Sequence, residues 1–104
     1  MKEENKLIAE FMGMESFKDM LSTLNNGKIN ISIDIYEQAK YHSSWDWLMP
    51  VVEKIEQTND GCTLVIIEDE RCYIDNQKGF EIDSVGHTKI EAVYNAVIKF
   101  IKNK

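Results

Sequence analysis

The residues best suited to binding or catalysis lie in one short segment, residues 41–47, which holds both tryptophans and the first histidine. His42 and Asp46 are four positions apart, a spacing at which helical side chains can meet and share a proton. Rigid aromatic rings around such a pair are typical of a recognition surface. We therefore take Tyr41, His42, Trp45 and Asp46 as candidate binding residues.

A structural role for the same segment is the alternative. Trp45 and Trp47 would then fill the entry to a helix, and Asp46 or Ser43 would cap it. Aromatic residues near a helix start belong to the core more often than to a site. Whichever role applies, Trp47 lies one turn before Val51, so we expect Trp47 to be more buried than Trp45.

Other chemistries find less support in the sequence. Cys62 and Cys72 both lie within apolar, strand-like runs, so we expect two buried thiols and neither a disulfide nor a Cys–His nucleophile. The acidic run 68–70 matches no metal-binding loop and is typical of a solvated turn. We expect no catalytic residues, no metal ligands, no cofactor and no enzymatic activity.

Composition narrows the classes of partner. The chain has 104 residues, 43% of them hydrophobic, which predicts a single domain over residues 1–104 with a proper core. A formal charge of -6 argues against binding to nucleic acid or to an anionic membrane, and it is compatible with a basic partner. No apolar run is long enough for a membrane helix or a secretory signal, so we expect a cytoplasmic protein.

The first half of the chain predicts helices and one strand. Residues 6–12 have helical apolar spacing, and a second helix follows with Ser16 as its N-cap. Four isoleucines alternate with polar residues over 29–35, the period of a half-buried strand at a sheet edge. Residues 44–58 predict a helix that either begins at Pro50, after a short turn over 45–49, or continues through Pro50 with a kink; we favour the single kinked helix.

The second half predicts a three-stranded meander. The runs 63–68 and 71–75 are joined by a tight turn, and the third strand covers 80–83. The continuous apolar run of the first strand is typical of a strand covered on both faces. The register of the hairpin pairs Ile67 with Cys72 and Val65 with Ile74 on one face, and it places Leu64, Ile66 and Tyr73 on the other.

The last helix is the clearest element in the sequence. Thr88 and Glu91 form a capping box at its start. Apolar residues then repeat at spacings of three and four, and we expect the sheet to bury Ile90, Val93, Val97 and Ile101. The pattern as a whole predicts an α+β fold, with a mainly antiparallel sheet of three to four strands and helices on both faces, an αβα sandwich.

Two segments also resemble a known group of proteins. The run YHSSWDWLMPVVEKIE and the closing helix TKIEAVYNAVIKFIK are similar to small uncharacterised proteins of Bacteroidota and their phages, and more distantly to the phage αβα-sandwich domain. The resemblance covers roughly residues 41–101. It implies the fold and a phage or mobile-element setting, and it carries over no activity and no site residues.

Four kinds of function follow as hypotheses. We favour a non-enzymatic accessory protein of a phage or mobile element, an interaction module that binds a host protein. The alternative is a protein that binds a small, nucleotide-like ligand in the cleft of a homo-oligomer. A double-stranded-RNA-binding-like module fits the order of helix, three strands and helix, but the acidic turns disfavour it. A hydrolase that uses His42 with Asp46 ranks last.

Overall fold

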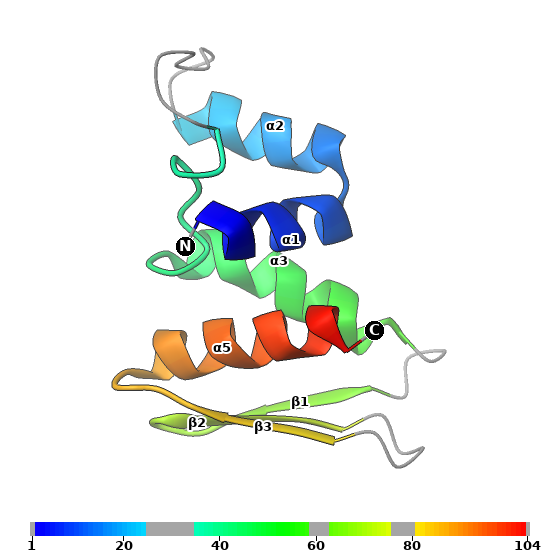
Figure 1. The fold of residues 1–104 in the computed structure, drawn as a ribbon, viewed down its shortest axis with the longest axis vertical. Coiled ribbons are helices and arrows are strands. Elements are labelled where there is room, and N and C mark those ends of the chain that lie inside the picture. Colours follow the sequence, from blue (N-terminus) through cyan, green and yellow to red (C-terminus); the bar gives the residue numbers. More distant parts are fainter. Residues whose placement is uncertain (1, 25–34, 59–62, 76–80, 104) are drawn as a thin grey trace.

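Four helices and one antiparallel sheet make up the part of the chain that the computed structural model describes, which is residues 2–24, 35–58, 63–75 and 81–103 (Figure 1). The elements are α1 (Lys2–Met12), α2 (Met14–Leu24), α3 (Trp45–Glu56), β1 (Leu64–Ile67), β2 (Arg71–Asp75), β3 (Glu81–Val85) and α5 (Lys89–Lys102). The predicted α+β class with an antiparallel sheet is confirmed. None of the helices in the described ranges is long and apolar enough to cross a bilayer.

The sheet has the order β1-β2-β3, and its hairpin register is the one that the sequence predicts. Ile67 lies opposite Cys72 and Val65 opposite Ile74. The turn between the first two strands is closed by a hydrogen bond from the Glu68 N–H to the Arg71 carbonyl, at 2.8 Å. The third strand continues to Val85, beyond its predicted end at residue 83, and residue 80 lies outside the described ranges.

The layers are arranged differently from the expected sandwich. All the described helices lie on one side of the sheet: α5 covers the sheet, α1 and α3 pack on α5, and α2 packs on α1 (Figure 1). On the other side Leu64 and Ile66 are 46% and 49% exposed. The inference that β1 is covered on both faces is therefore wrong for the described residues, because an apolar run alone does not show what covers it.

The last helix begins and packs as predicted. The Thr88 hydroxyl accepts a hydrogen bond from the Glu91 N–H at 3.2 Å, which is one half of the capping box. Val93 and Val97 are fully buried, while Ile90 and Ile101 are partly buried against the core. Their burial anchors α5 on the inner face of the sheet.

The start of α2 corrects one prediction. Gly13 has a φ of 94°, which a glycine adopts without the steric cost that a side chain would add. Its carbonyl accepts a hydrogen bond from the Phe17 N–H, so the helix begins at Met14 and Ser16 lies inside it. The prediction of Ser16 as N-cap is wrong, because the left-handed glycine turns the chain directly into the second helix.

The third helix is a single element that contains Pro50, as predicted. Ser44 occupies its N-cap position in an extended conformation, and the Ser44 side chain makes no capping hydrogen bond. Residues 35–43 approach it through turns. The strand predicted over 29–35 falls almost wholly outside the described ranges, and Ile35 lies in a turn.

Candidate functional site

The aromatic segment divides between the core and the surface. Tyr41 is buried, and its ring meets Trp47 edge to face with centroids 5.1 Å apart. Phe17 of α2 contacts both rings, at 6.3 and 6.2 Å. Trp47 is 5% exposed and Trp45 is 37% exposed, so the expected difference between the two indoles is confirmed. Tyr41 and Trp47 thus join α2 to the start of α3.

His42 and Asp46 do not form the proton-sharing pair that their spacing allows. His42 lies in a turn before the helix, and its ring meets Tyr94 of α5 edge to face at 6.2 Å. His42 Nδ1 is buried without a hydrogen-bond partner among the described residues. Burial, followed by the charge of Lys40, lowers the pKa of His42. Asp46 is exposed on the first turn of α3 and lines a shallow cavity of about 470 Å³.

The four predicted binding residues therefore do not gather on one surface. Tyr41 is in the core, His42 faces α5, and Trp45 and Asp46 lie on the exposed first turn of α3. Met49 is 36% exposed and follows Trp45 by one turn, so these two side chains form a small apolar spot. Scattered apolar residues of this size are normal on a protein surface.

A larger apolar surface lies on the side of the sheet away from α5, which we call the outer face. The register alternates inward and outward side chains along each strand. The outer face consists of Leu64, Ile66, Glu68, Arg71, Tyr73, Asp75, Glu81, Asp83 and Val85. Ile66, Tyr73 and Asp83 form one row across the three strands, and Val85, at 65%, is the most exposed of its large apolar residues.

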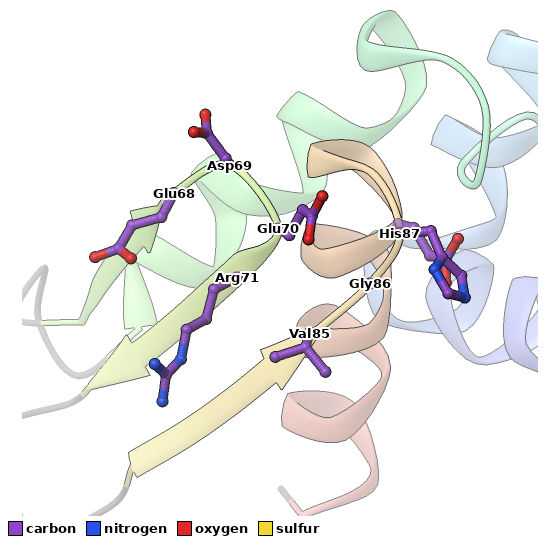
Figure 2. A pocket seen from close by; sticks show the side chains of 8 residues that line it. Glu68, Asp69, Glu70, Arg71, Val85, Gly86 and His87 are labelled. Carbon is purple, nitrogen blue, oxygen red and sulfur yellow. The ribbon is translucent and has the colours of Figure 1, made fainter.

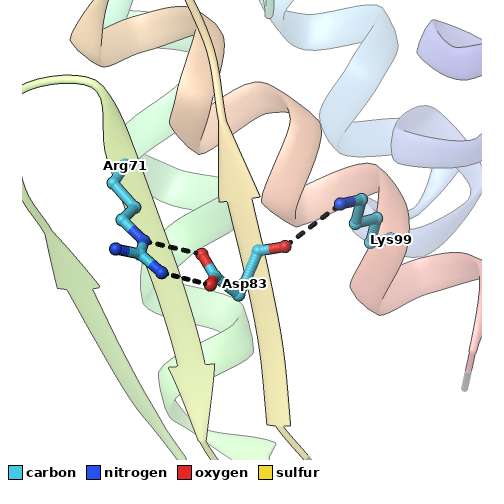
Figure 3. A network of polar contacts seen from close by, with 3 residues as sticks. All are labelled: Arg71, Asp83 and Lys99. Atoms are coloured by element: carbon cyan, nitrogen blue, oxygen red, sulfur yellow. Dashed lines mark hydrogen bonds and ion pairs between the residues drawn. The ribbon is translucent and has the colours of Figure 1, made fainter.

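An ion pair holds the outer face in a defined arrangement. Arg71 Nε and Nη2 donate to the two carboxylate oxygens of Asp83 at 3.1 and 2.7 Å (Figure 3). The guanidinium also lies 4.8 Å from the ring centroid of Tyr73. These hydrogen bonds raise the pKa of Arg71 and lower the pKa of Asp83. Lys99 of α5 donates to the Asp83 carbonyl at 3.0 Å and ties the helix to the edge of the sheet.

The charge of the outer face is strongly negative. Four of its nine side chains are carboxylates, from Glu68, Asp75, Glu81 and Asp83, and Arg71 supplies a single positive charge. The face thus combines exposed apolar side chains on β1 and β3 with acidic side chains on β2, on β3 and at Glu68, which directly follows β1. Such a surface attracts cations and repels anions.

An open cavity of about 610 Å³ adjoins the outer face at the turn between β1 and β2 (Figure 2). Acidic side chains predominate in its lining, which comprises Glu68, Asp69, Glu70, Arg71, Val85, Gly86, His87 and Glu91. The carboxylates of Glu68, Asp69 and Glu70 point in different directions. Within the described residues no group of three or more His, Cys, Asp or Glu side chains could hold a metal ion.

The thiol that the structure describes is not placed for nucleophilic chemistry. Cys72 is fully buried on the inner face of β2, and it is not part of a disulfide. Burial raises the pKa of Cys72 to about 11, so the thiol stays protonated and unreactive near neutral pH. Cys62 lies outside the described ranges.

Comparison with known proteins finds no matching family model, no matching curated protein and no matching solved structure. The resemblance to phage and Bacteroidota proteins therefore stays a prediction.

The outer face is not among the sites predicted from the sequence, although the residues that form it were already placed on one side of the sheet. The hairpin register placed Leu64, Ile66 and Tyr73 together on one face, and the structure confirms that placement. The run of four apolar residues in β1 suggested a covering layer on both sides of the strand, so an exposed apolar surface was not expected there. The acidic residues of the meander were likewise interpreted as solvated turns rather than as neighbours of exposed apolar side chains.

Proposed function

We propose that this protein is a non-enzymatic protein-interaction module that binds its partner on the outer face of the sheet. The observation that carries the proposal is the group of exposed Leu64, Ile66 and Val85 side chains around Tyr73. Exposed apolar residues that adjoin one another and are rimmed by polar groups mark interaction surfaces. A rigid aromatic ring with an arginine beside it is also the composition favoured at interface hot spots.

The size of the outer face indicates a transient interaction. Three strands at about 4.8 Å spacing and five residues at about 3.4 Å rise cover roughly 14 by 17 Å. This area lies below the 800 Å² or so per partner of a standard stable interface. An interaction of this size suits an accessory protein that engages and releases a host protein, which is the setting that the sequence resemblance implies.

The charge of the molecule favours a protein partner over the other classes. The acidic cavity and the acidic outer face would repel the phosphates of a nucleotide-like ligand or of double-stranded RNA. A thermal-shift screen against nucleotides tests the ligand hypothesis, since a ligand that binds only the folded protein raises its melting temperature.

The proposal can be tested by capturing partners from a lysate of the source cell. The wild-type protein is compared with two variants that are matched in the exposed apolar area they remove. The double variant Leu64→Thr/Ile66→Thr removes apolar area from the outer face and places β-branched residues suited to a strand at both positions. The control, Trp45→Ser/Met49→Ser, removes the apolar spot on α3. We expect the captured protein to be lost with the first variant and retained with the control, both variants having near wild-type circular dichroism. Capture that survives the outer-face variant would refute the proposal.

A further inference from the structure

We infer that the outer face receives an amphipathic helix with basic flanks, supplied by the partner protein, and that this helix forms a second helical layer on the sheet. The inference rests on the proposed function and names the partner's chemistry. Its starting point is the asymmetry of the sheet. The inner face is covered by α5 (Figure 1), while the outer face exposes Leu64, Ile66 and Val85.

The shape of the outer face fits a helix. A helix is about 10 Å across, so one helix covers most of the roughly 14 Å width of three strands. About 11 residues, or three turns, span the roughly 17 Å length of the strands at 1.5 Å per residue. An apolar stripe of two or three side chains would then meet the row of Ile66 and Tyr73, with Leu64 and Val85 towards either end.

The negative charge of the outer face determines the charge expected of the residues that flank the helix. Glu68 directly follows β1 at one end of the sheet, and Glu81 begins β3 at the opposite end, so the two carboxylates lie on either side of the row of Ile66 and Tyr73. Lysine or arginine residues that flank the apolar stripe of a helix would lie next to these carboxylates. The Arg71–Asp83 pair is already satisfied internally, so it supports the surface, and Glu68 and Glu81 are the carboxylates that we assign to the partner.

The same charge disfavours the other occupants. A second copy of this chain would bring two acidic faces together, and a like-charge contact of this kind opposes association. Nucleic acid and anionic lipid would be repelled for the same reason. A basic protein segment is the occupant whose charge complements the face.

Two synthetic peptides of roughly 14 residues test the inference directly. Both carry leucines along one helical face and alanines elsewhere, and the flanks carry lysines in the first peptide and glutamates in the second. Fluorescence anisotropy with the full chain should give a dissociation constant on the order of 10 to 100 μM for the lysine peptide. The glutamate peptide should bind at least about tenfold more weakly, and added salt should reduce the difference.

Variants of the protein separate the two parts of the contact. Leu64→Thr/Ile66→Thr should weaken binding of the lysine peptide by about tenfold or more, because half-exposed apolar area is removed from the contact. Glu68→Gln/Glu81→Gln, which keeps shape and removes charge, should weaken it severalfold and flatten the salt dependence. The matched control Glu53→Gln/Glu56→Gln on α3 should leave binding unchanged.

Several outcomes would overturn the inference. Equal binding of both peptides would refute the basic character of the partner helix. Binding that the outer-face variants do not change would refute its location on the outer face. Protection of the Leu64 and Ile66 methyl groups from a soluble paramagnetic probe in the free protein would show that the chain covers this face itself. A dimer in sedimentation that the Leu64→Thr/Ile66→Thr variant dissolves would assign the face to a second copy. If the peptide experiments refute the basic helix, the capture experiment with the outer-face variant still tests the proposed function separately.

Discussion

Removal of one buried hydroxyl, by Tyr94→Phe, should measurably destabilise this protein. The Tyr94 hydroxyl donates to Asn5 Oδ1 at 3.0 Å, across 89 positions of the chain, and joins α5 to α1. The Asn5 side chain is also buried, and its Nδ2 donates to the Tyr36 carbonyl at 2.9 Å. Burial, with the charge of Glu4, raises the pKa of Tyr94 to about 12, so the hydroxyl keeps its proton throughout the neutral range.

The magnitude follows from the acceptor that is left behind. In the Tyr94→Phe variant Asn5 Oδ1 stays buried without this donor, which costs about 1–3 kcal/mol. For a domain of this length each kcal/mol lowers the melting temperature by roughly 4–8 °C. We therefore expect a drop of about 4–24 °C in a thermal melt, and a lower urea midpoint with an unchanged slope.

Two further variants make the Tyr94 prediction specific. Tyr73→Phe removes the equivalent hydroxyl from a half-buried ring on the outer face and should change the free energy of unfolding by less than about 0.5 kcal/mol. The double variant Asn5→Leu/Tyr94→Phe replaces both partners by apolar groups and should recover part of the loss. The interpretation is refuted if Tyr94→Phe unfolds at the wild-type urea concentration, or if Tyr73→Phe proves equally destabilising.

Three other perturbations have directions that the structure sets. Gly86→Ala would place a Cβ 2.6 Å from the Ala92 backbone nitrogen, so it should cost about 1–3 kcal/mol in urea unfolding, and a wild-type midpoint would contradict this. The pKa of His42 is lowered in the folded state, so the unfolded state takes up its proton first and stability falls as the pH drops below about 6.5. His42→Gln should reduce the stability lost between pH 7 and 5.5, and an unchanged loss would exclude this histidine as a cause. Acrylamide should quench the fluorescence of a variant that keeps only Trp45 more strongly than one that keeps only Trp47, and equal quenching would be at odds with their burial.

Features that depend on residues close together in the chain could be predicted from the sequence, among them the hairpin register and the start of α5. The two-residue turn before Arg71 fixes the register of the hairpin, and strict alternation then assigns each side chain to a face. The capping box of Thr88 and Glu91 marks the start of α5 because the hydroxyl and the N–H that it satisfies are three residues apart. The different burial of Trp45 and Trp47 follows from helical geometry alone.

Features that depend on distant parts of the chain could not be predicted in this way. The aromatic cluster of Phe17, Tyr41 and Trp47 joins three separate segments, so the sequence alone left the role of Tyr41 open. His42 and Asp46 have the spacing of a helical pair, but the helix begins only after Ser44, so His42 turns towards Tyr94 instead. The spacing rule failed because it presumes a helix at both residues.

The position of the sheet explains both the main error in the predicted layers and the proposed function. The sequence suggested a central sheet, yet α5 is the element that is covered on two sides, by the sheet and by α1 and α3. Half of its 14 residues are buried, including Ala92 and Ala96, and a helix that is apolar on more than one face belongs inside a fold. With α5 at the centre, the sheet becomes an outer layer. The two-sided apolar pattern of β1 then calls for a cover beyond the described helices, and the acidic outer face favours a basic one.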